Sequence, residues 1–265
     1  MTMTNPMTNT DANFLASLLT ELRLPSIAHN WQRIVEAADR EGWPAQKTIA
    51  TLMEIEVAER ASRRIQRHRL QSEAPAGKTF ASFDFDAAPG VRKQQLLSLG
   101  AGGDWIKNGD NLLLFGKSGT GKSHAIAAIC HALIDAGSRV LFTRTVDITQ
   151  QLQTARRDLS LISALEKLDK FELIVLDDFS YVRKDQAETS VLFELIAHRY
   201  ERHSIAITAN QAFSAWSTVF PDAAMTAAAV DRLVHHATII EMNGESHRER
   251  AAVRRAAKEN PQGIA

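Results

Sequence analysis

The segment GKSGTGKS, residues 116–123, combines glycines, a lysine and a serine at the spacing of a phosphate-binding loop. The glycines let the backbone bend so that successive N–H groups converge on phosphate oxygens, at the positive end of a following helix. Lys122 is expected to reach the β- and γ-phosphates of a nucleoside triphosphate, and the Ser123 hydroxyl is expected to bind Mg²⁺. The predicted nucleotide-binding residues are Gly116, Lys117, Ser118, Gly119, Thr120, Gly121, Lys122, Ser123 and His124.

Two acidic residues end the apolar run LIVLDD, residues 173–178. A phosphate-binding loop needs a carboxylate at the end of another buried strand to hold the magnesium shell, and Asp177 fits this position. Asp178 is then the better candidate for polarising the attacking water. Active sites of open α/β sheets lie at the carboxyl ends of the strands, so we expect this acidic pair to face the loop.

Asn210 follows another apolar run, SIAIT at residues 204–208. Its side-chain amide could orient the attacking water or contact the γ-phosphate. Asn is also common where a strand exits into a turn, so a purely local role stays open. We predict Asn210 as the third polar element of the site.

Apolar runs alternate with longer helical segments after residue 79. This alternation is typical of an α/β fold in which helices cover both faces of a parallel sheet. The predicted strands are 111–115, 139–143, 173–177, 204–208 and 238–241. The predicted helices are 122–135, 146–157, 162–167, 187–201 and 225–235.

The N-terminal part of the chain shows helical patterns instead. Pro25, Gly42 and Pro44 interrupt these patterns, which predicts three short helices over residues 11–71. The segment QSEAPAGKT, residues 71–79, concentrates small and turn-forming residues and is typical of a linker. We therefore expect a small all-α N-terminal domain, a linker, an α/β nucleotide-binding domain and a basic C-terminal tail, at residues 1–71, 72–90, 91–250 and 251–265.

Charge is balanced over the whole chain but not along it. Thirty-one basic residues cancel 31 acidic ones, so the net charge gives no sign of a polyanionic partner. Five arginines nevertheless fall close together in one predicted helix, where they could contact DNA phosphates or form a solvated face. These residues are Arg60, Arg63, Arg64, Arg67 and Arg69.

Composition also excludes several classes of protein. No apolar stretch is long enough to span a membrane, and the polar start MTMTNPMTNTDANF lacks the apolar centre of a signal peptide, so we expect a cytoplasmic location. Cys130 has no partner for a disulfide and is expected in the core. The histidines show no metal-ligand spacing, and the adjacent His235 and His236 are expected to diverge on a helix.

Five segments occur in the order expected of AAA+ ATPases of the DnaC and IstB type: GKSGTGKS, LIVLDDF, ITANQ, AVDRLVHHATII and NGESHRER. The segments LRLPSIAHNWQRIVEA, EIEVAERASRRIQRHR and FASFDF resemble more specifically the IstB family, the ATP-dependent helpers of bacterial insertion-sequence transposition. The resemblance covers residues 22–250. It implies ATP with Mg²⁺ and an AAA+ P-loop domain whose five-stranded parallel sheet has the order 5-1-4-3-2.

The same resemblance implies catalytic roles for two further arginines. Arg232 matches the family's arginine finger and Arg248 its second arginine sensor, although His247 stands where relatives more often have an aromatic residue. Such a finger implies a homo-oligomer with ATP sites at subunit interfaces. IstB-like proteins bind double-stranded DNA with little sequence preference through segments like the arginine run, and their partner is the cognate transposase.

The alternatives differ in partner or chemistry. A DnaC-like helicase loader shares the ATPase segments, and only the N-terminal segment favours DNA and a transposase. A small-molecule kinase would use the same loop with an acceptor pocket and a mobile lid. A GTPase is disfavoured because the N-K-x-D pattern is absent after ITAN, and a recombinase because no set of three separated carboxylates is evident.

Overall fold

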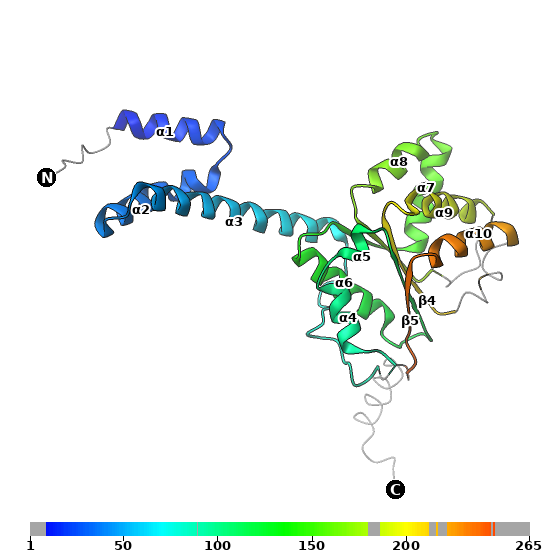
Figure 1. Ribbon diagram of the computed structural model, residues 1–265. Helices are drawn as coiled ribbons and strands as arrows, with labels where there is room; N and C mark the ends of the chain where they lie inside the picture. Colours follow the sequence, from blue (N-terminus) through cyan, green and yellow to red (C-terminus); the bar gives the residue numbers. More distant parts are fainter. Residues whose placement is uncertain are drawn as a thin grey trace, which may run out of the picture. The chain divides into compact units, whose positions relative to one another are not determined.

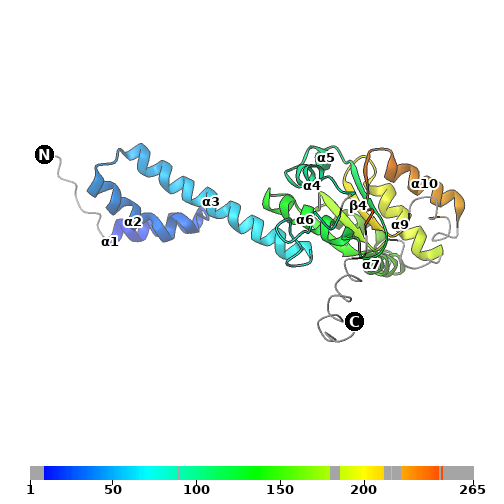
Figure 2. The same ribbon diagram turned by 90° about the horizontal axis from the view of Figure 1, so that it is seen from below.

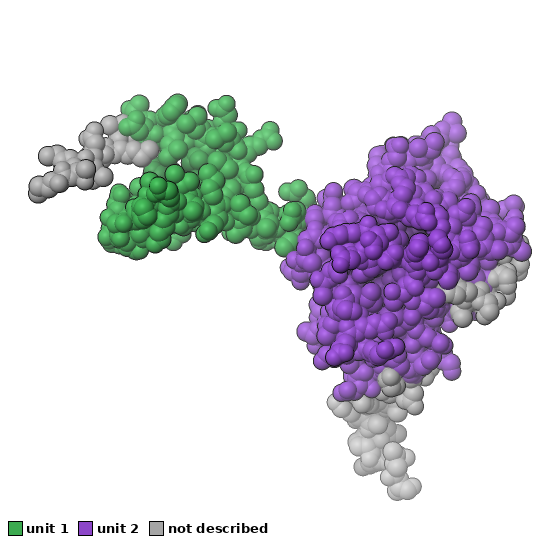
Figure 3. Space-filling view, viewed as in Figure 1, with its two compact units in different colours: residues 1–67 green, residues 68–265 purple. Residues whose placement is uncertain are grey.

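The computed structural model (Figure 1, Figure 2) describes residues 9–88, 90–179, 186–211, 216, 222–244 and 246. The chain divides into two compact units, residues 1–67 and residues 68–265 (Figure 3). The division falls inside one long helix, between Arg67 and His68. Each unit has buried apolar residues of its own.

Three helices form the described part of the first unit: α1 (Asn9–Glu21), α2 (Pro25–Glu41) and α3 (Ala45–Ser72). Pro25 begins α2, where its fixed φ suits the first turn, and Gly42 ends α2 in the left-handed conformation at φ 67°. α3 is 28 residues long, so the prediction of a short third helix is wrong. Neither Gly nor Pro occurs between its ends, and the helix therefore has no local reason to stop.

Glu56 of α3 joins α3 to the first turn of α2. Its buried carboxylate accepts hydrogen bonds from the backbone N–H groups of Ser26 (2.8 Å) and Ile27 (3.2 Å). Arg60 and Arg63 contact the other carboxylate oxygen at 2.8 and 3.4 Å. Burial by itself raises the pKa of Glu56, but the hydrogen bonds from Arg60 and from the two backbone amides outweigh burial and lower this pKa below its ordinary value.

Among the residues that the structure describes, five parallel strands form one sheet in the second unit. They are β1 (Asn111–Phe115), β2 (Val140–Arg144), β3 (Leu173–Asp177), β4 (Ser204–Ala209) and β5 (Ala237–Glu241). Their order is β2-β3-β4-β1-β5, which confirms the predicted order read from the other edge. The inner strands β1, β3 and β4 are buried along their whole length, as a sheet covered on both faces requires.

Helices lie on both faces of this sheet (Figure 1, Figure 2). One face packs against four helices: α7 (Thr145–Arg157), α8 (Leu161–Leu168), α9 (Gln186–Arg199) and α10 (Ala223–Val234). α6 (Lys122–Asp135) packs on the other face, with α4 (Lys93–Gly100) against it, and the short α5 (Asp104–Lys107) precedes β1. The predicted strands and helices of this unit are confirmed to within two residues at their ends, whereas α4 and α5 were not predicted.

The expectation that Cys130 lies in the core is confirmed. Cys130 is fully buried in α6, and this burial raises the pKa of its thiol, which therefore stays protonated. None of the described helices combines the length and the apolar character needed to cross a bilayer.

We predict that Glu56→Gln lowers the free energy of unfolding of the first unit by about 1.5–3 kcal/mol at pH 7, because charge-assisted hydrogen bonds are lost. The pKa of Glu56 is lower in the folded state than in the unfolded state, so this stabilisation is complete above the unfolded pKa and disappears as the pH falls through the folded pKa. Hydrogen exchange of the first turn of α2 in the full-length protein, followed from pH 7 to below pH ~4, measures the difference.

The exposed Glu59→Gln, three residues along the same helix, is the matched control and should leave the exchange unchanged. Equal effects of the two substitutions would show that Glu56 does not join the helices.

Candidate nucleotide-binding site

The loop 116–121 connects β1 to α6 at the carboxyl edge of the sheet. Gly116 has φ 149°, and a Cβ there would lie 2.3 Å from the carbonyl oxygen of Met242, so no side chain fits. Gly121 precedes the helix at φ 94°, in the left-handed region that glycine adopts without strain. These conformations place the N-terminus of α6 at the open side of the loop, as phosphate binding requires.

Lys122 lies inside this loop rather than in solvent. Its side chain is 5% exposed, and its Nζ donates hydrogen bonds to the carbonyl oxygens of Gly116 and Lys117, each at 2.8 Å. Thr120 closes the same turn, because its hydroxyl donates to the carbonyl oxygen of Lys117 at 2.9 Å. The ammonium group is thus held inside the loop by its carbonyl oxygens, a position that fits a role in phosphate binding.

Ser123 and Asp177, the two predicted magnesium ligands, are in contact. The Ser123 hydroxyl donates to Oδ1 of Asp177 at 2.8 Å, and the hydroxyl of Thr208 donates to the same oxygen. Thr145 donates to the backbone carbonyl of Asp177 at 2.9 Å. A hydroxyl and a buried carboxylate that meet at one point are the hard oxygen donors that Mg²⁺ prefers, so these residues fit the ion.

Asp178 and Asn210 face the loop across one pocket of about 410 Å³. Asp178 is exposed and has φ 55°, a left-handed conformation in which Thr208 holds its backbone N–H at 3.0 Å. Asn210 directly follows β4 and is half-buried. The pocket is also lined by seven residues of the loop and of α6: Ser118, Gly119, Thr120, Gly121, Lys122, Ser123 and His124.

The segment before α4 forms a further wall of this pocket, which the sequence interpretation treated only as a linker. Phe83 packs edge-on against the ring of His124, with the ring centroids 5.2 Å apart. Nε2 of His124 lies 3.1 Å from the hydroxyl of Ser82 and 3.2 Å from the carbonyl oxygen of Thr79. The other lining residues from this segment are Lys78, Asp84, Ala87 and Ala88. The aromatic residues in this otherwise turn-rich stretch were the sequence feature that could have predicted its packing against the pocket.

The predicted arginine finger is not among the residues that line the pocket. Arg232 lies on α10 and is half-buried, and its Nη1 donates to the carbonyl oxygen of Ala228 at 3.0 Å. Its guanidinium carbon lies 5.1 Å from the ring centroid of Phe193 and 6.0 Å from that of Tyr200. Arg248, the predicted second sensor, and the basic tail 251–265 lie outside the described residues.

The five predicted DNA-binding arginines of α3 fall into two groups. Arg60 and Arg63 pair with Glu56, and Arg69 pairs with Asp135 at 2.6 Å. Arg64 and Arg67 are exposed, three residues apart, and neither forms an ion pair with any residue that the structure describes.

The sequence and the fold are similar to known proteins. The family described as IstB-like ATP binding protein matches residues 17–255. An insertion sequence ATP-binding protein of Sinorhizobium fredii is 59% identical over 251 residues, which cover 95% of this chain and 84% of that protein. An insertion sequence ATP-binding protein of Geobacillus stearothermophilus is 32% identical over 232 residues, which cover 86% of this chain and 91% of that protein.

Solved structures share the fold at lower sequence identity. DnaI aligns with a TM-score of 0.54 at 17% identity, over 65% of this chain and 96% of that chain. Domain III of the Thermotoga maritima replication initiation protein DnaA aligns with a TM-score of 0.52 at 18% identity, over 73% of this chain and 78% of that chain. The sheet order and the phosphate-binding loop are those of an AAA+ domain, and because the family match spans most of the sequence, the chain belongs to the IstB-like ATP-binding proteins.

Proposed function

We propose that this protein is an ATP-dependent AAA+ regulator that assembles on DNA and assists the transposase of a bacterial insertion sequence, with ATP hydrolysis controlling assembly. The observation that carries the ATPase part is the meeting of Lys122, Ser123 and Asp178 around one pocket, with Asp177 hydrogen-bonded to Ser123. The names of the relatives support the insertion-sequence context. They favour this function over that of a DnaC-like loader, for which the structural likeness concerns only the fold.

Each residue of the site has a distinct role in this proposal. Lys122 exchanges its loop carbonyls for the β- and γ-phosphates of ATP, and the loop N–H groups bind the remaining phosphate oxygens. Ser123 and Asp177 hold Mg²⁺, which neutralises negative charge on the phosphates when it is bound. Asp178 accepts a hydrogen bond from the attacking water, and the amide of Asn210 orients that water from the end of the neighbouring strand.

Arg232 is proposed to act on the ATP of a neighbouring subunit. It is absent from the pocket lining of its own chain, so a role in hydrolysis requires a second copy to bring it close. The rings of Phe193 and Tyr200 lie within cation–π distance of its guanidinium group and help to hold it in place. A homo-oligomer with ATP sites between subunits satisfies this requirement.

Double-stranded DNA is proposed to contact the exposed face of α3. Arg64 and Arg67 carry this role best, because they are exposed and unpaired among the described residues. Arg60 and Arg63 already neutralise Glu56 within the first unit. Contacts to phosphates depend on charge and not on base identity, which agrees with binding of little sequence preference.

We predict that two substitutions separate nucleotide binding from hydrolysis. Lys122→Ala should weaken ATP binding at least about tenfold, because the charge that fixes the phosphates is removed. Asp178→Asn should keep ATP binding through Lys122, Ser123 and Asp177, yet slow hydrolysis about 10²-fold or more. Calorimetric titration with a non-hydrolysable ATP analogue and phosphate release measure the two effects.

The exposed Glu166→Gln on α8 serves as the matched control and should behave as wild type. Normal ATP affinity in Lys122→Ala would refute the site. Loss of binding in Asp178→Asn would show that the two aspartates have the opposite roles.

We predict that mixing Arg232→Ala with Lys122→Ala restores ATP hydrolysis that neither variant shows alone. Arg232→Ala by itself should lower turnover roughly 10³-fold. In random oligomers of an equal mixture, about one quarter of the interfaces combine an intact Lys122 with an intact Arg232 from the next subunit. Phosphate release in the presence of DNA measures the recovery.

The control mixture pairs Arg232→Ala with the double variant Lys122→Ala/Arg232→Ala, which offers no intact interface and should stay inactive. If the first mixture is equally inactive although light scattering shows that the variants co-assemble, Arg232 does not act between subunits.

We predict that Arg64→Gln/Arg67→Gln makes the salt dependence of DNA binding shallower. Each lost phosphate contact removes about 0.9 from the slope of log K against log salt, so the slope should change by about 2 per protomer. Affinity should fall by a similar factor for unrelated duplex sequences. Fluorescence anisotropy with labelled duplexes, in the presence of ATP, measures both quantities.

Arg33→Gln/Arg40→Gln removes the same charge from exposed positions of the neighbouring helix α2 and is the matched control. An equal change of slope in both double variants would mean that only the net charge of the unit matters. An unchanged slope in Arg64→Gln/Arg67→Gln would exclude this helix face as the DNA contact.

A further inference from the structure

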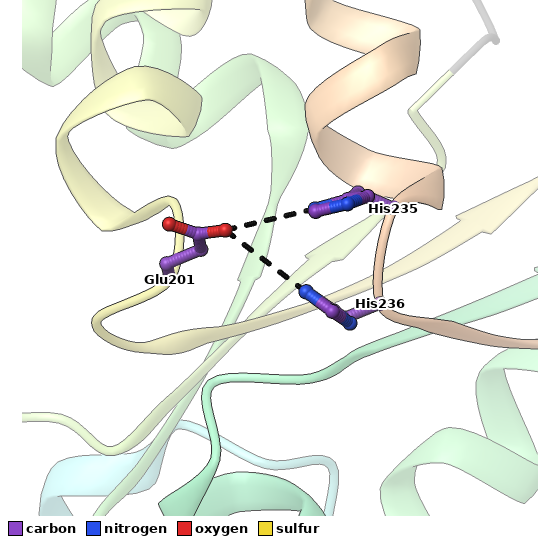
Figure 4. A group of neighbouring side chains, drawn as sticks. All are labelled: Glu201, His235 and His236. Carbon is purple, nitrogen blue, oxygen red and sulfur yellow. Dashed lines mark ion pairs between the residues drawn. The ribbon is translucent and has the colours of Figure 1, made fainter.

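Glu201, His235 and His236 converge on one point at the surface of the second unit (Figure 4). Oε1 of Glu201 lies 3.6 Å from Nδ1 of His235 and 3.9 Å from Nε2 of His236. One ligand atom from each of the three residues lies within 4.8 Å of those of the other two. None of them lines the nucleotide pocket.

This convergence corrects the expectation that the two histidines diverge. They would diverge if both belonged to one helix, but α10 ends at Val234. His235 keeps helical angles as the C-cap, and β5 begins at Ala237, so the chain changes direction between the two side chains. As a result both imidazoles face the carboxylate of Glu201, and their ring centroids lie 4.1 Å apart.

Asn111 at the start of β1 fixes both backbone segments that carry these side chains. Its Nδ2 donates to the carbonyl oxygen of Leu233 at 3.1 Å, and its backbone N–H donates to that of His236 at 2.6 Å. Its Oδ1 accepts the N–H of Ile205, just after the turn with Glu201, at 2.9 Å. Asn111 is buried, and it therefore fixes the backbone around the two histidines relative to the backbone that follows Glu201.

A hydrogen bond also orients the first imidazole. The hydroxyl of Tyr200 lies 2.8 Å from Nδ1 of His235, the same nitrogen that faces Glu201. A metal ion bound to this nitrogen would replace the hydrogen bond from Tyr200, because one ring nitrogen cannot hold both partners.

We propose that Glu201, His235 and His236 form a binding site for Zn²⁺. Two imidazole nitrogens and one carboxylate oxygen are a ligand set typical of zinc, and a water molecule completes a four-coordinate shell. Bonds of 2.0–2.1 Å in tetrahedral geometry place the ligand atoms about 3.3 Å apart. The distances of 3.6 and 3.9 Å from the Glu201 oxygen exceed this value by about 0.3 and 0.6 Å, and all three ligand atoms lie within 4.8 Å of one another.

The three side chains have room to make this adjustment because they are 52–55% exposed. Mg²⁺ and Ca²⁺ do not fit, since these ions prefer oxygen ligands over imidazole nitrogens. A bound zinc ion would link the turn before β4 to the end of α10, three residues after Arg232. The ion would thus fix the end of the helix that carries this arginine.

Isothermal titration of Zn²⁺ into the untagged, nucleotide-free full-length protein tests the site. Wild type should bind one zinc ion, and His235→Gln/His236→Gln should lose this binding. Glu201→Gln keeps both imidazoles and should bind at least about tenfold more weakly. His29→Gln removes an exposed histidine of α2 and should bind zinc as wild type does.

Thermal unfolding with and without Zn²⁺ checks that the variants are folded. Because the three side chains are exposed, the metal-free variants should unfold at the wild-type temperature. Zinc should raise this temperature for wild type and His29→Gln, less for Glu201→Gln, and not for His235→Gln/His236→Gln. Intense visible absorption of bound Co²⁺ in wild type would support a four-coordinate site. Absence of zinc binding by wild type, or unchanged binding by His235→Gln/His236→Gln, would overturn the proposal.

Discussion

The hydroxyl of Thr208 on β4 is the contact on which the geometry of the nucleotide site depends. It donates to the carboxylate of Asp177 and accepts the backbone N–H of Asp178, while the carbonyl of Thr208 accepts the N–H of Phe179 at 2.9 Å. The hydroxyl of Ser123, in the first turn of α6, donates a hydrogen bond to the same carboxylate oxygen of Asp177. Three elements that are distant in sequence are thereby fixed at one edge of the sheet, which a parallel arrangement with β3 beside β4 makes possible.

This contact also explains why Asp178 keeps a left-handed backbone conformation, which costs free energy for a residue with a side chain. Thr208 holds its N–H on one side, and the next residue, Phe179, is fully buried against Trp216, with ring centroids 4.6 Å apart. The turn therefore points the carboxylate of Asp178 into the pocket while the phenyl ring enters the core. Trp216 in turn donates its indole N–H to the carbonyl oxygen of Gln211, the residue after Asn210.

In the first unit, the charged residues of α3 have two different roles. Burial of Glu56 is possible only because backbone amides and two arginines surround its carboxylate. Arg60 and Arg63 thus serve the fold of this unit, whereas Arg64 and Arg67 keep their charge at the surface of the same helix. One basic run therefore contains both structural cations and cations available to a polyanion, and helical position alone does not distinguish them, since Arg60, Arg64 and Arg67 share a face.

The sequence by itself determined the features whose signals are local. The phosphate-binding loop lies in eight consecutive residues, 116–123, and the strands of the sheet are short apolar runs, so motif and periodicity were sufficient for both. The order of the strands came from the family resemblance, because spacing along the chain does not specify which strands are neighbours. Only the tertiary structure decided which distant side chains meet: Thr208 with Asp177, Glu56 with the start of α2, and Glu201 with the two histidines. Hydrogen-bond and ion-pair partners are selected by distance and burial in three dimensions, and residue type in a linear sequence carries neither quantity.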